Sequence, residues 1–237
     1  MFNGLIAKSE IRDNILILIP PELNDDNILI LVSHGSGGIG NAEWNTANFF
    51  LQKGYKVGLL DYFSKWNINK LLWTYRPVQD EYDITFNQIL TDIKFPENNI
   101  IHIGFSLGGY LGILNNDVFT KNYCFYPGIL GYIPEKDYNN KTVIFAEKDN
   151  WCPSSNLFKN SIIAKDCYHG FMIPGKNRSI PVAKYNFPKV IQYEEFKKLK
   201  ANHRYLSNAY GHIEEKIRLQ YDENHCIIYL NMILESI

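Results

Sequence analysis

The sequence predicts an α/β fold in which a mostly parallel central sheet carries helices on both faces. Apolar, β-branched runs alternate with helix-compatible stretches over about two-thirds of the chain, as in repeated strand–helix units. In two places a glycine-rich turn directly follows such a run, and ligands of open α/β sheets bind at the carboxyl ends of strands. The length of 237 residues suits one domain, so we expect residues 1–237 to share a single core.

The apolar runs place the strands in order along the chain. The first strand, at residues 15–19, ends at two prolines, and the second, at 28–32, ends in a glycine-rich turn. Residues 55–60 form the third strand, which ends at Asp61. Later apolar runs predict strands at residues 100–103, 123–126, 143–145 and 165–168.

Helices are predicted where apolar residues recur on one face or where cap residues stand. Residues 42–53 place apolar side chains on one side, and Gly54 follows as a C-cap. A second helix begins near Pro77, which suits a first helical turn, and ends near residue 93. Further helices are predicted at residues 109–114, at 153–163 and from Asp222 onward.

Residues 170–221 show neither the apolar period of a helix nor the alternation of a strand. They contain Pro174, Pro181 and Pro188, and a charged run that begins at Glu194. We expect a surface insertion at about residues 175–220 that packs on the domain. A lid or pocket wall over the active site is the alternative, because long loops often carry function.

The composition excludes several classes of partner. The formal net charge is −1, with 46% hydrophobic and 21% charged residues, so we expect no nucleic acid and no anionic membrane as partner. No run approaches the roughly 18 apolar residues of a membrane span, and no signal-peptide cleavage pattern follows the first apolar run. The four cysteines show no paired spacing. We therefore expect a reduced, cytoplasmic protein, and the sequence does not indicate its oligomeric state.

The sequence Gly104-Phe105-Ser106-Leu107-Gly108 has the pattern Gly-x-Ser-x-Gly between a predicted strand and a predicted helix. Such a turn is so tight that only glycine fits two residues before and after the serine, whose hydroxyl is exposed at the end of the sheet. A serine hydroxyl is a weak nucleophile and needs an adjacent base, which in turn needs an orienting acid. Ser106 is therefore the predicted nucleophile.

In this kind of fold the acid and then the base follow the serine along the chain. Asp149 comes just after the strand predicted at 143–145 and is the predicted acid, with Glu147 as its rival. His169 directly follows the strand predicted at 165–168 and is the predicted base. Three other histidines follow the serine in helical or irregular sequence, and we expect them to be solvated: His203, His212 and His225.

Acyl transfer places negative charge on the carbonyl oxygen, which two preorganised N–H groups can stabilise. The first predicted donor of this oxyanion hole is the backbone N–H of Leu107, the residue after the nucleophile. The second is expected in the His-Gly-Ser-Gly-Gly turn after the second strand, with Ser36 as the best position and Gly37 next. One alternative is a phosphate-binding loop, although the turn lacks the glycine spacing and the lysine of such loops. The other alternative is a plain tight turn.

Four separated segments together resemble the dienelactone hydrolase family of α/β-hydrolases: His-Gly-Ser-Gly-Gly, Gly-Phe-Ser-Leu-Gly-Gly, Glu-Lys-Asp-Asn-Trp-Cys-Pro and Tyr-His-Gly-Phe. The resemblance covers roughly residues 10–175. It implies the α/β-hydrolase fold, with Ser106 as nucleophile, Asp149 as acid and His169 as base. Dienelactone hydrolases themselves use a cysteine nucleophile, so the serine here favours a general ester hydrolase.

These predictions describe a serine hydrolase that cleaves a carboxylic ester or lactone through an acyl-enzyme intermediate. We expect a small-molecule substrate and neither a cofactor nor a metal. An acyltransferase or small peptidase on the same fold is one alternative, and an inactive member that only binds a ligand is another.

Two further groups of residues have an expected role and an alternative. Cys152 and Cys167 lie near the predicted acid and base; packing is their expected role, and a regulatory disulfide between them is the alternative. Aromatic residues between positions 62 and 75 are expected to pack in the core, with an acyl pocket as the alternative: Tyr62, Phe63, Trp66, Trp73 and Tyr75.

Overall fold

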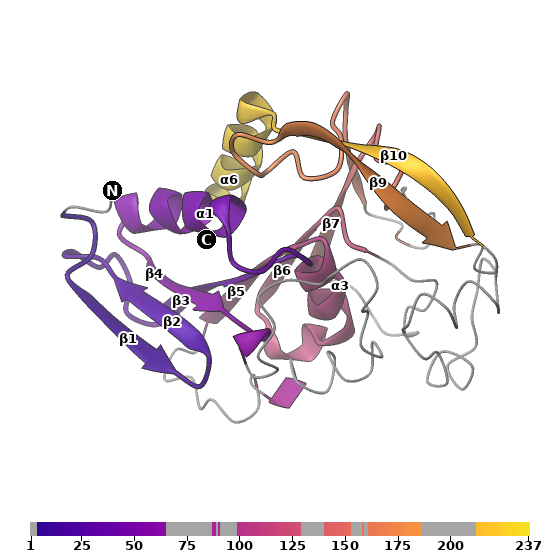
Figure 1. Cartoon of the computed structure of the whole chain (residues 1–237). Coiled ribbons are helices and arrows are strands. Elements are labelled where there is room, and N and C mark those ends of the chain that lie inside the picture. Colours follow the sequence, from indigo (N-terminus) through magenta and orange to yellow (C-terminus); the bar gives the residue numbers. More distant parts are fainter. Residues whose placement is uncertain are drawn as a thin grey trace.

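The computed structural model describes residues 4–64, 87–88, 90, 99–128, 140–152, 158, 161–185 and 212–237. Within them, one eight-stranded sheet has the order β1-β2-β4-β3-β5-β6-β7-β8 (Figure 1). The neighbouring strands from β4 through β8 run parallel, and β2 is antiparallel to β4. The predicted mostly parallel sheet is therefore confirmed. Its strands are β1 (Lys8–Arg12), β2 (Ile15–Ile19), β3 (Ile28–Ser33), β4 (Lys56–Leu60), β5 (Asn99–Phe105), β6 (Lys121–Phe125), β7 (Lys141–Ala146) and β8 (Ile162–Ala164).

Helices cover both faces of this sheet, as predicted. α1 (Asn41–Gln52) and α6 (Glu223–Ser236) lie on one face, and α3 (Leu107–Leu114) lies on the other (Figure 1). Gly54 follows α1 with φ +77°, the left-handed conformation of a C-cap glycine. Asp222 caps α6 by accepting a hydrogen bond from the His225 N–H. Within the described residues, no helix is both long and apolar enough to cross a membrane.

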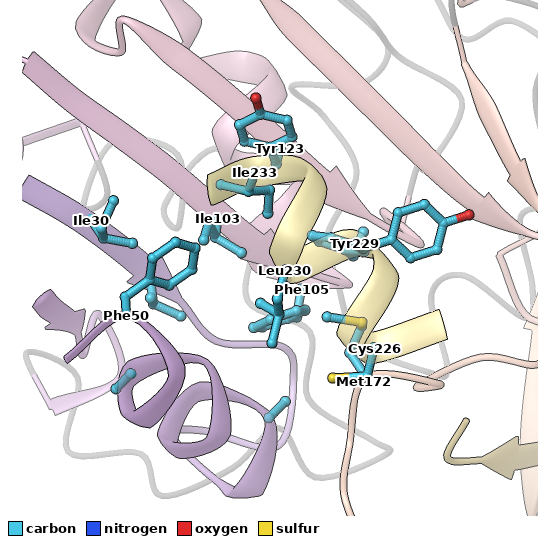
Figure 2. Packing of buried hydrophobic residues seen from close by; sticks show 14 of the residues in the cluster. Ile30, Phe50, Ile103, Phe105, Tyr123, Met172, Cys226, Tyr229, Leu230 and Ile233 are labelled. Carbon is cyan, nitrogen blue, oxygen red and sulfur yellow. The ribbon is translucent and has the colours of Figure 1, made fainter. Parts of the chain in front are cut away.

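The side chains of β3 show why both faces are covered. Ile30 is buried with Phe50 of α1 and Leu230 of α6 (Figure 2). Leu29, its neighbour in the strand, is buried on the opposite side with Leu111 of α3. Because successive side chains of a strand point to opposite faces, one continuous apolar run contributes to two cores.

The first strand of the sheet was not predicted. β1 pairs with β2 through a tight turn in which Asp13 and Asn14 have φ +39° and +69°, a conformation that these two residue types tolerate. β1 carries charged residues and lies at the edge of the sheet, where exposed charge protects against pairing with another chain. An edge strand of this kind lacks the apolar run by which the other strands are found.

The last strand of the sheet lies earlier than predicted. Residues 165–168 are not a strand, because Asp166 adopts φ +58° in a turn. The strand is β8, which pairs with β7. It begins at Ile162, where the end of the helix at 153–163 was predicted. Its β-branched Ile162 and Ile163 favour a strand, and the helix prediction lacked a stop signal. The rest of that helix and the helix predicted at 77–93 fall mostly outside the described residues.

The insertion predicted at about 175–220 begins and ends as strands. β9 (Asn177–Tyr185) and β10 (His212–Gln220) form an antiparallel ribbon beyond the sheet (Figure 1). Residues 186–211, where much of a lid would lie, are outside the described residues. Pro181 obscured the strand pattern, but a two-stranded ribbon tolerates proline because each strand has a free edge.

Candidate active site

Ser106 lies at the sharp turn between β5 and α3. Its backbone has φ +51° and ψ −110°, a strained conformation that serine rarely adopts. The turn is held on both sides: the Ser106 N–H donates to the Phe125 carbonyl at 2.9 Å, and its carbonyl accepts from the N–H groups of Tyr110 and Gly128. These bonds fix the serine at the carboxyl end of β5.

The two outer glycines of the motif are required by contact distances. A Cβ atom on Gly104 would lie 2.6 Å from the Gly108 carbonyl oxygen. A Cβ atom on Gly108 would lie 2.6 Å from both the His34 carbonyl oxygen and Ser33 Oγ. The start of α3 can therefore pack directly on the ends of β3 and β5 only because these positions lack side chains.

We expect Gly108→Ala to lower the melting temperature by several degrees. The added methyl group meets backbone atoms of β3, so α3 must shift, and overpacking of this kind costs about 1–3 kcal/mol. Gly37→Ala is the matched control, since nothing lies within 4 Å of a Cβ atom there. Thermal unfolding of both variants checks this, and equal melting temperatures would contradict the close packing of α3 on β3.

The structure brings Asp149 and His169 together from two loops. Asp149 follows β7, and His169 follows β8. His169 Nδ1 and Asp149 Oδ2 are hydrogen-bonded at 2.7 Å, and both residues are buried. Asp149 Oδ1 accepts hydrogen bonds from the N–H groups of Trp151 and Cys152. One carboxylate oxygen therefore holds its own loop, and the other orients the imidazole ring.

Burial and charge act in opposite directions on this pair. Burial alone would raise the pKa of Asp149, but His169 and the two backbone N–H groups hold the pKa below its usual value. Burial alone would lower the pKa of His169, but the Asp149 carboxylate, with a further contribution from Cys152, outweighs it and raises the pKa above 6.5. The two side chains thus stabilise each other's charged forms.

Two aromatic rings enclose the His169 imidazole. The ring centroids of Tyr126 and Trp151 lie 4.8 and 4.7 Å from it. Tyr126 follows β6, the strand next to the one that carries Ser106. Neither aromatic residue was predicted to act at the site, although Tyr126 ends the strand predicted at 123–126 and Trp151 follows the predicted acid by two residues.

Ser106 and the Asp149–His169 pair border the same region. The position of a Cβ atom on Gly128 lies 4.0 Å from Ser106 Oγ and 3.8 Å from Cys152 Sγ. The Cys152 sulfur in turn lies within 4.8 Å of a His169 nitrogen. The hydroxyl, the thiol and the imidazole therefore gather above the carboxyl ends of β5, β6 and β7.

The glycine-rich turn after β3 contacts the serine from the other side. A Cβ atom on Gly35 would lie 3.2 Å from Ser106 Cβ and 3.3 Å from the Phe105 carbonyl oxygen. The two predicted donor positions, Ser36 and Gly37, directly follow this contact. Leu107, the other predicted donor, begins α3 next to the serine. Leu107 is thus the chain neighbour of Ser106, and Ser36 and Gly37 follow the residue of the turn that contacts it.

A residue that sequence analysis missed supports this turn. Glu43 of α1 is buried, and its Oε2 accepts a hydrogen bond from the Gly40 N–H at 2.8 Å. Burial raises the pKa of Glu43, although the nearby backbone N–H groups of Gly40 and Gly35 oppose the shift. Glu43 is the third residue of α1 and bonds back to the N-cap N–H, which is half of a capping box. The predicted helix began one residue later, and glycine stands where the signature has serine or threonine, so the sequence pattern did not indicate this contact.

The ribbon of the insertion contacts the loops of the pair. Trp151 packs on Ile217 and Leu219 of β10. His169 forms an isolated parallel bridge with Leu219, and the Asn150 side chain donates to the Lys216 carbonyl. The last part of the insertion, β10, therefore braces the segments that carry Asp149 and His169.

A second chain of serine, histidine and amide lies beneath α3. His102 is hydrogen-bonded through Nε2 to Ser33 Oγ at 2.7 Å and through Nδ1 to Asn122 Oδ1 at 2.8 Å. All three side chains are completely enclosed, and a Cβ atom on Gly112 would overlap the ring. Burial lowers the pKa of His102 to about 4. Since no substrate reaches these groups, they serve to connect β3, β5 and β6.

The rival predicted residues lie elsewhere. Glu147 pairs with Lys165 at 2.7 Å and accepts from the Asp166 N–H, at the surface. His225 lies at the start of α6 and His212 at the start of β10, while His203 is outside the described residues. Among the candidates that the structure describes, only Asp149 and His169 form a hydrogen-bonded acid–imidazole pair.

The remaining predictions concern cysteines and aromatic residues. All four cysteines are described and none forms a disulfide, so Cys152 and Cys167 are not bridged. Tyr62 and Phe63 are buried beside His34, which favours core packing over an acyl pocket for these two. Trp66, Trp73 and Tyr75 lie outside the described residues.

Comparison with solved structures shows the fold. An α/β serine hydrolase without a lid from Xanthomonas campestris superposes with a TM-score of 0.52 at 12% identity, covering 68% of this chain and 84% of that one. An α/β serine hydrolase homologue from Coxiella burnetii gives a TM-score of 0.48 at 11% identity, over 68% and 88% of the two chains. No protein-family model and no curated protein sequence matches the chain. The chain has the α/β-hydrolase fold, as predicted.

Proposed function

We propose that this protein is a serine hydrolase that cleaves small carboxylic esters or lactones. The observation that carries the proposal is the buried hydrogen bond between His169 Nδ1 and Asp149 Oδ2, in a loop region that also borders the hydroxyl of Ser106. The strained conformation of Ser106 at the start of α3 supports it, since such strain is common at functional sites. The motif resemblance to dienelactone hydrolases points to the same substrate class.

The hydrogen bond between His169 and Asp149 supports one proton route. Because Nδ1 is bonded to Asp149, the other ring nitrogen of His169, Nε2, is the atom that takes the proton as Ser106 Oγ attacks the acyl carbonyl. The resulting imidazolium then protonates the leaving alcohol, and the acyl group stays on the serine. His169 then removes a proton from a water molecule as that water attacks the ester. The imidazolium returns the proton to Ser106 Oγ, and the acid product leaves.

Negative charge develops on the acyl oxygen in both steps. We assign its stabilisation to the Leu107 N–H and to an N–H of the turn at Ser36 or Gly37. Both are backbone donors beside Ser106, and Glu43 helps to keep the turn in place. Donors that are fixed before the reaction stabilise the transition state without reorganisation.

A product analysis tests the proposal. Purified protein is expected to hydrolyse p-nitrophenyl butyrate and simple lactones, and to give mainly the free acid when alcohols and amines are added. Predominant transfer to the added alcohol or amine would instead indicate an acyltransferase. Absence of turnover on every ester and lactone of a broad panel would contradict the proposal.

The rate is expected to depend on the protonation of His169. The protonated imidazole cannot accept the serine proton, so kcat/KM should rise as pH rises through the pKa of this group. Since Asp149 raises that pKa, the midpoint is expected above 6.5. A pH profile of kcat/KM from neutral to alkaline pH measures it, and a midpoint below 6.5 would contradict the assigned role of Asp149.

A further inference from the structure

A group of side chains that could bind a metal ion lies outside the proposed active site. Cys167 Sγ, a carboxylate oxygen of Asp222 and a ring nitrogen of His225 all lie within 4.8 Å of one another. Cys167 is in the segment between β8 and His169, and the other two residues begin α6. Thiolate, imidazole and carboxylate together are a typical ligand set for zinc.

The two ligands at α6 are held in place by other contacts. Asp222 Oδ1 accepts a hydrogen bond from the His225 N–H at 3.0 Å, which leaves Oδ2 to face the ring at 3.2 Å from Nδ1. The aromatic rings of Phe171 and Tyr229 lie against the imidazole. Both side chains are therefore oriented before an ion binds, which lowers the cost of binding.

The ring nitrogen that faces Asp222 is poorly satisfied. Among the described residues, His225 Nδ1 has no hydrogen bond of good geometry, although it lies 3.2 Å from Asp222 Oδ2. The two side chains are 27% and 34% exposed, so an ion could reach this nitrogen from solvent. Cys167 is itself enclosed, at 1% exposure, on the inner side of the group.

We infer that Cys167, Asp222 and His225 bind a zinc ion, with water as the fourth ligand. Bond lengths of about 2.0–2.3 Å place tetrahedral ligand atoms about 3.5 Å apart, so the three side chains need only small rotations. Binding replaces the thiol proton of Cys167, which is released to solvent. The ion would connect α6 to the segment that carries His169 two residues later.

This group could not be predicted from the sequence, because Cys167 is far from Asp222 along the chain. Among the residues that the structure describes, the other group with three possible ligands is Asp149, Cys152 and His169. In that group both Asp149 oxygens already accept hydrogen bonds. An ion there would have to replace the acid–imidazole bond of the site, so the group at α6 is the better candidate.

Cobalt(II) titration of the metal-free, reduced full chain tests the inference. Cobalt is expected to bind with one equivalent and to give a thiolate charge-transfer band that zinc abolishes by competition. Asp222→Asn keeps the helix cap, and His225→Phe keeps an aromatic ring, yet each should weaken binding at least about tenfold. Cys167→Ser should remove the band, while Cys152→Ser, the control for the other group, should leave it unchanged.

Thermal unfolding gives a second readout that does not depend on enzyme activity. Zinc at about 100 times its Kd should raise the melting temperature by roughly 5–10 °C in the wild type and in Ser106→Ala. The inference is overturned if no thiolate band forms, if the band survives in both Asp222→Asn and His225→Phe, or if it disappears in Cys152→Ser. None of these outcomes depends on whether the protein hydrolyses esters.

Discussion

Ser106→Ala is expected to lower kcat/KM for p-nitrophenyl butyrate by at least about 10⁴-fold. Loss of the nucleophile removes the acyl-enzyme route, and only substrate binding and the oxyanion donors remain to assist attack by water. Alanine at positive φ carries the same strain as serine, so the variant should fold with nearly the same melting temperature. Steady-state kinetics and thermal unfolding of the variant measure both quantities.

Ser36→Ala is the matched control for that experiment. Ser36 follows Gly35, the residue of the turn that contacts Ser106, but the proposal uses only its backbone N–H, which alanine retains. We expect its kcat/KM to stay within about threefold of the wild-type value, since the oxyanion donor is unchanged. A loss at position 36 as large as that at position 106 would contradict the assigned roles of the two serines.

Asp149→Asn is expected to lower kcat/KM by about 10⁴-fold while leaving the loop in place. The N–H groups of Trp151 and Cys152 donate to one oxygen of residue 149, so the amide oxygen of asparagine should take that place. The amide NH₂ then faces His169 Nδ1 and donates to it. This fixes the proton on Nε2, the atom that must accept the serine proton, and the base is lost.

Glu147→Gln is the control for the acid. Its carboxylate pairs with Lys165 at the surface, and surface ion pairs contribute roughly 0–1 kcal/mol. We expect kcat/KM to remain within about threefold of wild type. If the glutamine variant lost activity and Asp149→Asn retained it, the acid would be assigned wrongly.

Most of the fold could be predicted because the strands from β2 to β7 are buried on both faces. Their apolar runs, such as Ile15–Ile19, are visible without any knowledge of neighbours. The same applies to Ser106, because the close approach of α3 to β3 requires a glycine pattern that is local in sequence. Asp149 could be predicted because it follows β7. His169 was predicted to follow a strand at 165–168, whereas the strand is β8 at Ile162–Ala164.

What the sequence could not predict depends on distant pairing. β8 is a strand because β7 lies beside it, and its three residues alone are too few to define a period. Trp151 contacts His169 and also packs on β10, and both contacts join segments that are apart along the chain. Cys167 and His225 lie close together because a loop and the start of α6, far apart along the chain, come together in the fold.

Labelling with a fluorophosphonate tests the central claim most directly. The reagent bonds to an activated serine, so intact mass should increase by one phosphonyl group, and peptide mapping should locate it on Ser106. Asp149→Asn should react much more slowly, and Ser106→Ala should not react. An adduct on a different serine, or wild-type protein that hydrolyses esters yet stays unlabelled, would contradict the account.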